Sequence, residues 1–139
     1  MKKPDSYYLQ SGVIPFRLKD EELEILLITS RKKKKWILPK GIIESGMKPY
    51  ESAAQEALEE AGIVGEVIQE SLGSYKINKW DGTCEVLVYP MRVEKETAQW
   101  LEDSFRERKW FTVEGALEVI ERGKIKKLIK KLHDQLKKQ

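Results

Sequence analysis

Two features common in other proteins are nearly absent from this chain of 139 residues: cysteine and long apolar runs. Cys84 is its only cysteine, which excludes an internal disulfide and a cysteine-based zinc site. No stretch approaches the ~20 consecutive apolar residues that span a bilayer, and no apolar segment follows the N-terminal lysines as it does in a secretory signal. We therefore expect a protein of the reducing cytoplasm that makes no contact with a membrane.

Length and composition favour one folded unit. The chain is 40% hydrophobic and 35% charged, so we expect it to bury a real core under a heavily charged surface. The sequence contains no internal repeat and no low-complexity segment. We expect residues 1–139 to form a single domain.

Charge is unevenly distributed, although the formal net charge is only +3. Basic residues are concentrated in segment 31–35 and from Arg122 onward, while acidic residues are concentrated between Glu44 and Glu60. This separation suits an anionic ligand held by basic side chains beside a metal held by acidic ones. It equally suits ordinary solvated faces, so charge alone leaves both interpretations open.

Hydrophobic periodicity and turn residues predict strands, one helix, further strands and then two helices. Strands are expected at residues 7–19 and 23–29, which would form a hairpin, and at 36–38, 64–79 (one or two strands), 83–93 and 109–113. Helices are expected at residues 49–61, with Gly62 as C-cap, and at 114–122 and 124–138. This order is typical of α+β or mixed α/β proteins, in which helices flank a mixed sheet.

Glycine and proline refine these predictions at three places. Gly41 and Gly46 indicate a loop before the first helix. Pro90 indicates that the far end of strand 83–93 lies at a sheet edge or a bulge, because proline donates no ladder hydrogen bond. The polar segment 94–106 is expected to be a loop.

Three glutamates, Glu56, Glu59 and Glu60, lie on one flank of the predicted helix 49–61, because their spacing matches the helical repeat. Like charges one turn apart destabilise a helix by a few tenths of a kcal/mol, and a divalent cation would relieve that repulsion. Carboxylate oxygens are the ligands that Mg²⁺ and Mn²⁺ prefer. A solvated acidic face is the alternative on composition alone.

Residues 41–63 resemble the Nudix box, the 23-residue signature of hydrolases that cleave a diphosphate linked to another moiety. The signature is matched in register by Gly41, Glu56, Glu59, Glu60, Gly62 and Ile63. The resemblance implies a Nudix-type α/β/α sandwich with a mixed sheet, and a pyrophosphatase in which water attacks a phosphorus atom. Mg²⁺ is the implied cofactor, with Mn²⁺ as the alternative. A match of this length favours a metal site over a solvated acidic face.

Two positions depart from the Nudix signature. Met47 stands where the family has a glutamate, and Gln55 stands where it has an arginine. The resemblance implies that in the family this pair braces the loop against the helix. Losing one member would leave an unpaired, partly buried charge, whereas losing both leaves two neutral side chains that can still pack. Our hypothesis is that the double change removes a support and that the metal site survives.

The resemblance also implies roles for the acidic residues. Glu56 and Glu60 are the expected metal ligands, and Glu59 is either a further ligand or the base that takes the proton of water. A backbone carbonyl of Lys40 or Gly41 is expected to complete the ligand shell, because glycine permits close approach. In several family members the base comes from the loop before the last strand, where this chain carries Glu102, which we favour, as well as Asp103 and Glu107.

The substrate expected from the resemblance is a small phosphorylated molecule. The segments around Ser30-Arg31 and Trp36 resemble the diphosphoinositol polyphosphate phosphohydrolase branch. This favours a dinucleoside polyphosphate, such as a diadenosine polyphosphate, or an inositol pyrophosphate, ahead of ADP-ribose or a modified nucleoside triphosphate. By the same analogy Arg17, Arg31 and Lys40 are the candidates to hold phosphates, Arg31 by a bidentate contact.

Two other classes of function remain open. A Nudix-fold module that senses nucleotides with little turnover is supported by Met47 and Gln55 and opposed by the intact glutamates. RNA binding through the basic C-terminal helix is disfavoured, because packing on the sheet already explains the apolar stripe of that helix. A second copy of the chain, forming a homodimer, is the one protein partner that we consider.

Overall fold

The computed structural model describes residues 6–79 and 81–137. Its strands and helices follow the predicted order, which is strands, one helix, further strands and two helices. In chain order they are β1 (Ser6–Lys19), β2 (Glu22–Thr29), β3 (Trp36–Ile37), β4 (Lys40–Ile42), α1 (Pro49–Ala61), β5 (Ile63–Val67), β6 (Gly73–Lys79), β7 (Gly82–Glu96), β8 (Arg108–Thr112), α2 (Val113–Val119) and α3 (Gly123–Lys137).

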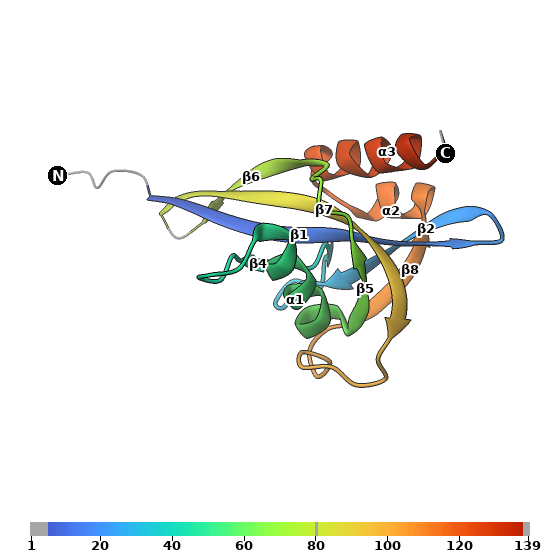
Figure 1. Cartoon of the computed structure of the whole chain (residues 1–139), viewed down its shortest axis with the longest axis horizontal. Helices are drawn as coiled ribbons and strands as arrows, with labels where there is room; N and C mark the ends of the chain where they lie inside the picture. The colour runs from blue at the N-terminus through green and yellow to red at the C-terminus, as the bar shows by residue number, and fades with distance from the viewer. Residues whose placement is uncertain (1–5, 80, 138–139) are drawn as a thin grey trace.

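The strands form one mixed sheet with a helical layer on each side (Figure 1). β1 runs parallel to β7 at its centre, while β2, β5 and β6 pair antiparallel with these two strands. In Figure 1, α1 lies on one side of the sheet and α2 and α3 lie on the other. The predicted α+β fold, an α/β/α sandwich with a mixed sheet, is confirmed.

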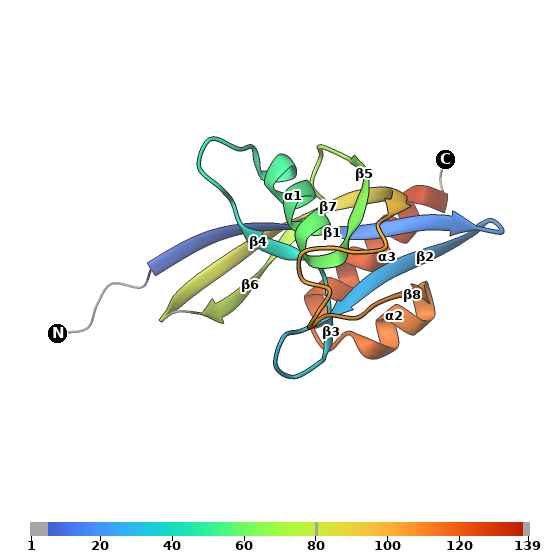
Figure 2. The ribbon, with the colours of Figure 1, turned by 90° about the horizontal axis from the view of Figure 1, so that it is seen from below.

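β1 and β2 pair at their hairpin end and then diverge (Figure 2). Residues 16–19 of β1 pair with β2, whereas residues 10–12 on the same edge pair with β4. On the facing edge of β2, residues 28–29 pair with β3. Leu38 and Pro39 therefore carry the chain across the gap between the two diverging strands, and the carbonyl of Pro39 accepts a hydrogen bond from Val13 N at 3.1 Å.

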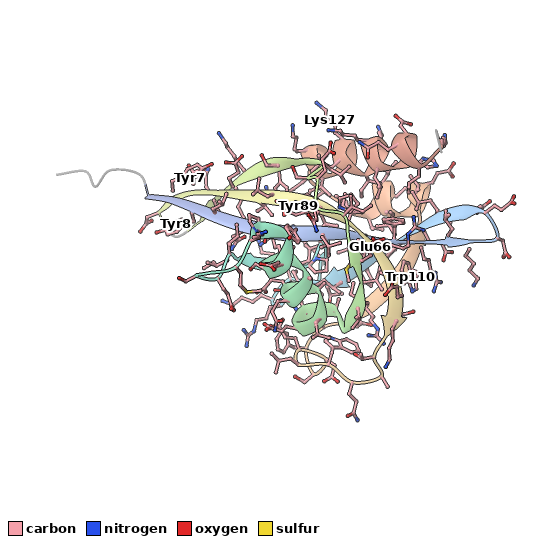
Figure 3. The ribbon with its side chains drawn as sticks, in the orientation of Figure 1. Tyr7, Tyr8, Glu66, Tyr89, Trp110 and Lys127 are labelled. Atoms are coloured by element: carbon pink, nitrogen blue, oxygen red, sulfur yellow. The ribbon has the colours of Figure 1, made fainter. Side chains whose placement is uncertain are left out.

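Each face of the sheet has its own hydrophobic core. On the α1 face, Ala53, Ala57 and Ala61 pack on the sheet, and their small side chains let the helix lie close to it. The larger core lies between the sheet and the other two helices and includes Ile14, Phe16, Ile125, Leu128, Ile129 and Leu132. Because the apolar stripe of α3 is buried there, its lysines face outward, as Lys127 does in Figure 3. Packing thus accounts for this stripe without nucleic acid.

The predicted loop at Gly41 is wrong, because residues 40–42 form the short strand β4 on the free edge of β1. The helix prediction is confirmed, with Pro49 in its first turn and Gly62 as a left-handed C-cap (φ 65°). Within the described residues, every helix is too short or too polar to cross a bilayer.

Pro90 lies inside the sheet rather than at an outer edge. β7 continues to Glu96, so the predicted loop begins only at Thr97. Pro90 falls between the β6 pairing, which ends at Val88, and the β5 pairing, which begins at Met91. A missing N–H group is tolerated at this break in the ladder. α2 is also shorter than predicted, since it ends at Val119 and residues 120–122 connect it to α3.

Candidate active site

The loop between β4 and α1 is fastened to the start of the helix. The Ser52 hydroxyl is fully buried, donates to the carbonyl of Ile42 at 3.3 Å and accepts from Glu44 N at 3.3 Å. Glu51 accepts from Lys48 N at 2.9 Å and so satisfies a free N–H at the start of the helix. These contacts fix the position of α1 relative to β4.

Glu56 and Glu60 reach from α1 to β4. Glu60 Oε1 accepts from Lys40 N at 3.0 Å, and its side chain is only 12% exposed. A Cβ atom built on Gly41 would lie 2.6 Å from Glu56 Oε2 and still closer to Oε1 and Cδ. Gly41 therefore provides the room that the Glu56 carboxylate occupies, and the two carboxylates lie against neighbouring residues of one strand.

Both carboxyls are poised to hold a proton near neutral pH. Burial, followed by repulsion from Glu60, Glu59, Glu102 and Glu44, raises the pKa of Glu56 to about 7. Burial also raises the pKa of Glu60 to about 7, although the Lys40 N–H and the Arg106 guanidinium act in the opposite direction. A cation between these carboxylates would replace the proton and remove the repulsion.

The loop between β7 and β8 brings Glu102 to the helix. Glu102 N donates to the carbonyl of Glu59 at 3.1 Å, and the Glu102 carboxylate accepts from Arg106 Nε at 2.6 Å. The same guanidinium lies 3.6 Å from Glu60 Oε2 and donates from Nη1 to the carbonyl of Thr29 at 2.9 Å. Arg106 thus ties the loop, the helix and β2 together, and Glu102 joins the acidic cluster.

The carbonyls at the C-terminal end of α1 accept hydrogen bonds from side chains of the segment between β7 and β8 and of β8 itself. The last turn of the helix contains no basic residue and carries two glutamates. Arg108 Nη1 donates to the carbonyls of Ala61 and Gly62 at 3.0 and 3.2 Å, and Trp100 Nε1 donates to the carbonyl of Glu60 at 2.9 Å. The guanidinium of Arg108 stacks 4.1 Å above Trp100. Both side chains satisfy carbonyls that the helix leaves open.

The donor set fits a hard divalent cation. Glu56 and Glu60 offer the carboxylate oxygens that Mg²⁺ and Mn²⁺ prefer, and a ligand from the backbone at Gly41 stays a prediction. Glu59 is turned along the helix, where its Oε2 accepts from Gln55 Nε2 at 2.6 Å. Across residues 6–79 and 81–137, no three acidic, histidine or cysteine side chains stand together in ligating geometry. Glu56 and Glu60 are therefore the better placed of the three predicted ligands.

The structure shows the contacts of the two residues that depart from the Nudix signature, Gln55 and Met47. The neutral amide of Gln55 holds Glu59 by the hydrogen bond just described, while Met47 N donates to the carbonyl of Glu44 at 3.1 Å and closes the loop. Reinstating the charge pair with Met47→Glu and Gln55→Arg should change kcat/KM by no more than about tenfold, because exposed ion pairs contribute little. Steady-state rates of the double variant test this. An increase in kcat/KM of several orders of magnitude would show that the glutamates of the natural chain are poorly positioned.

The three predicted phosphate ligands are not brought together. Lys40 lies beside Glu60, and its Nζ donates to Gln10 Oε1 at 3.4 Å. Arg31 is exposed and stacks 4.5 Å above Phe105, next to Arg106. Arg17 lies about 16 Å along β1 from the residue that pairs with Lys40.

Arg17 is engaged by neighbours at its own end of the sheet. Its guanidinium binds Glu24 at 2.8 Å, lies 3.7 Å from Glu96 and stacks 4.0 Å above Trp110. Figure 3 places Trp110 far from Tyr7 and Tyr8, which lie at the start of β1. These contacts indicate a structural role for Arg17, and Lys40 and Arg31 remain the better phosphate candidates.

A pocket of about 540 Å³ opens beside Lys40, a volume typical of small-molecule sites. Its floor is apolar and includes Trp36, Leu38, Tyr75, Ile77, Ile120 and Ile125. Tyr75 lines the pocket, and burial raises the pKa of its hydroxyl above its usual range. Lys40 connects the pocket to the acidic cluster, because it lines the pocket and its backbone N–H donates to Glu60.

Two functional features escaped the sequence analysis. Arg106 is one of several basic residues in a charged segment, and nothing in its spacing distinguishes it. The pocket combines residues from the loop after β2, from β3 and β6, and from the connection between α2 and α3, which are far apart in the sequence. Only the tertiary structure assembles either feature.

Comparison with known proteins gives consistent matches. A family model described as the NUDIX domain matches residues 9–132. Nudix hydrolase 13, mitochondrial, of Arabidopsis thaliana is 33% identical over 137 residues, covering 83% of this chain and 68% of that protein. Diphosphoinositol polyphosphate phosphohydrolase 3-beta of Bos taurus is 32% identical over 121 residues, covering 85% and 72%.

Solved structures agree on the fold. A C. elegans Ap4A hydrolase in a binary complex superposes with a TM-score of 0.78 at 18% identity, covering 95% of this chain and 99% of that one. The NUDIX domain of Shewanella oneidensis NrtR, complexed with ADP ribose, superposes with a TM-score of 0.76 at 18% identity, covering 95% and 90%.

Proposed function

The chain belongs to the NUDIX family, hydrolases that cleave phosphorus anhydrides with the help of a divalent metal, and from this membership we propose that it acts on a dinucleoside polyphosphate or an inositol pyrophosphate-like substrate. The observation that carries the proposal is the meeting of two features at Lys40: the paired carboxylates of Glu56 and Glu60, and the 540 Å³ pocket. A substrate bound across them would place its phosphate chain at the glutamates and its organic part in the pocket.

Each residue of the cluster has a proposed task. Glu56 and Glu60 hold the metal, which we take to be Mg²⁺, and Gly41 leaves room for the Glu56 carboxylate. When bound, the metal stabilises charge on phosphoryl oxygens and lowers the pKa of a bound water. Glu59 and Glu102 are the candidates to accept the proton of the attacking water, since both adjoin Glu56.

Arg106 has a positioning task in this proposal. It holds Glu102 by a hydrogen bond of 2.6 Å and lies 3.6 Å from Glu60. A guanidinium in this place keeps both carboxylates oriented and partly offsets their repulsion. Lys40 and Arg31 are proposed to contact phosphate groups of the substrate.

The organic part of the substrate is proposed to occupy the pocket. Trp36 is held edge-on against Phe111, with ring centroids 5.0 Å apart, so its ring forms a firm wall. Tyr75, Ile120 and Ile125 are at most 5% exposed and form the apolar floor. A flat or partly apolar group is favoured by such a floor, and basic side chains at the rim favour an anionic tail.

A panel of diphosphate compounds, assayed with Mg²⁺ and with Mn²⁺ and with products identified, tests the proposal. The panel should contain dinucleoside polyphosphates, inositol pyrophosphates, ADP-ribose and nucleoside triphosphates. Metal-dependent cleavage of one of the first two classes with the highest kcat/KM is the expected result. Tight binding of a nucleotide without any product would instead identify a sensor module.

The proton affinity of the glutamates predicts an unusual dependence of stability on pH. In the folded protein the pKa values of Glu56 and Glu60 rise from an ordinary 4.5 to about 7. The folded state therefore binds protons more tightly than the unfolded state, and this contribution to stability is complete below pH 4.5 and is lost as the pH rises through 7. We expect the free energy of unfolding of the metal-free protein to fall over this interval.

Urea unfolding at a series of pH values, with and without Mg²⁺, measures this effect. Bound Mg²⁺ should reduce the fall, because the cation replaces the protons as partner of the carboxylates. A Glu56→Gln, Glu60→Gln double variant serves as the control and should show a flatter curve. If the metal-free natural chain shows no loss of stability between these pH values, the two carboxyls do not have raised pKa values.

A further inference from the structure

The rim of the pocket carries several cations and, among its lining residues in the described part of the chain, a single acid. Lys33, Lys35, Lys40 and Arg122 are the basic lining residues, and Glu121 is the acidic one. A site for an anionic ligand has no evident need of a carboxylate, which would repel the ligand. Glu121 must therefore have another role at the rim than contact with the ligand.

Glu121 bridges two walls of the pocket. Its Oε1 lies 2.9 Å from Lys35 Nζ, which belongs to the loop between β2 and β3, while Glu121 itself lies in the connection between α2 and α3. The loop is closed at its base, because Lys35 N donates to Ser30 Oγ at 2.9 Å and Ser30 N donates to the Lys35 carbonyl at 2.7 Å. Ile120, next to Glu121, is 3% exposed and anchors the other wall.

The contact is thus made by two exposed side chains on two anchored backbones. The side chains of Lys35 and Glu121 are 47% and 65% exposed, and an ion pair this exposed to water is weak. The hydrogen bond from Lys35, with the charges of Lys33 and Arg122, holds the pKa of Glu121 below its usual range, so the carboxylate stays charged. A phosphate group carries more charge and more acceptor oxygens than a carboxylate and can displace it from Lys35.

We propose that Glu121 determines specificity as an internal anion: it occupies Lys35 in the empty pocket and yields that lysine only to a strongly anionic group of the substrate. This inference rests on the proposed function, in which the pocket receives part of the substrate. A substrate with more phosphate charge near Lys35 gains more attraction to this lysine than is lost when the Glu121–Lys35 ion pair breaks. Glu121 therefore favours highly charged substrates over less charged ones. It has no part in bond cleavage.

Glu121→Gln tests the proposal, with Glu118→Gln as the matched control, since Glu118 is exposed on α2 and does not line the pocket. For the most highly charged good substrate, Glu121→Gln should lower KM by about threefold to fivefold and leave kcat unchanged. The decrease should be smaller for a substrate with fewer phosphates and should vanish at about 0.5 M salt. An unchanged KM, or an equal change in Glu118→Gln, would overturn the proposal.

Binding of inorganic tripolyphosphate, measured by calorimetry, separates this inference from the proposed function. Glu121→Gln should bind tripolyphosphate more tightly than the natural chain, and the difference should disappear when both proteins also carry Lys35→Gln. If this pattern appears but no diphosphate compound is cleaved, the role of Glu121 stands and the proposed function fails. If compounds are cleaved but the affinities are equal, the role of Glu121 is refuted.

Discussion

Replacing Glu60 with glutamine is expected to lower kcat by about 10³-fold, a loss of ~4 kcal/mol of transition-state stabilisation. The reason is charge. Glutamine has nearly the same shape and its carbonyl oxygen can still accept from Lys40 N, which lies 3.0 Å from Glu60 Oε1. It cannot balance a divalent cation as a carboxylate does. The loss should therefore appear in the metal-dependent rate and not in folding.

The stability of Glu60→Gln provides an internal check. Glu60 is a main source of the repulsion that raises the pKa of Glu56, so its neutralisation should leave the metal-free protein as stable as the natural chain or more so above pH 7. Initial rates over a range of Mg²⁺ concentrations, with unfolding curves on the same samples, measure both quantities. Glu118→Gln again serves as control. A Glu60→Gln rate within tenfold of the natural rate would exclude Glu60 as a metal ligand.

Gly41→Ala is expected to reduce kcat by about 10²-fold, because displacing a group of the active site by about 1 Å lowers the rate by about that factor. The free energy of unfolding should change by less than about 1 kcal/mol. The new methyl group would occupy the place of the Glu56 carboxylate. The obstacle is the far end of a flexible side chain, so the carboxylate moves and the backbone does not. Activity should therefore be lost without unfolding.

Gly65→Ala is the matched control with the opposite expectation. A Cβ atom there would collide with the backbone carbonyl of Arg92, on the neighbouring strand β7, and would lie 3.0 Å from Glu94 N. Backbone in a sheet cannot swing aside, so this variant should lose about 1–3 kcal/mol of stability. Assays of rate and urea unfolding on both variants give the comparison. If Gly41→Ala is fully active, Glu56 does not act from its observed position.

The parts of the molecule that the sequence predicts well are those set by local spacing. The helical repeat places Glu56, Glu59 and Glu60 on one flank, and the Nudix resemblance is confirmed by the family match. Gly62 ends the helix as expected because its φ of 65° suits glycine. The order of elements predicts helices that flank a mixed sheet, and the Nudix resemblance implies the α/β/α sandwich.

The parts that the sequence misses depend on distant partners. β4 has only three residues, too few for any periodicity, and it exists because β1 offers a free edge at residues 10–12. The sequence favours Glu102 over Asp103 and Glu107 without a physical reason, and only the fold shows that Asp103 accepts from the N–H of Trp100 while Glu102 N donates to Glu59. The single domain, the homodimer and the cytoplasmic location stay predictions.

The end of α1 depends on side chains from the segment 97–108, and this dependence has a thermodynamic consequence. Trp100 and Arg108 cap the helix, while Arg106 holds Glu60 and Glu102. The ordering of that segment and the positions of the glutamates are therefore linked, so a ligand that binds Glu56 and Glu60 should also stabilise the segment as far as Arg108. Conversely, a substitution that weakens the contacts of Trp100 or Arg108 with α1 should also weaken metal binding at the glutamates.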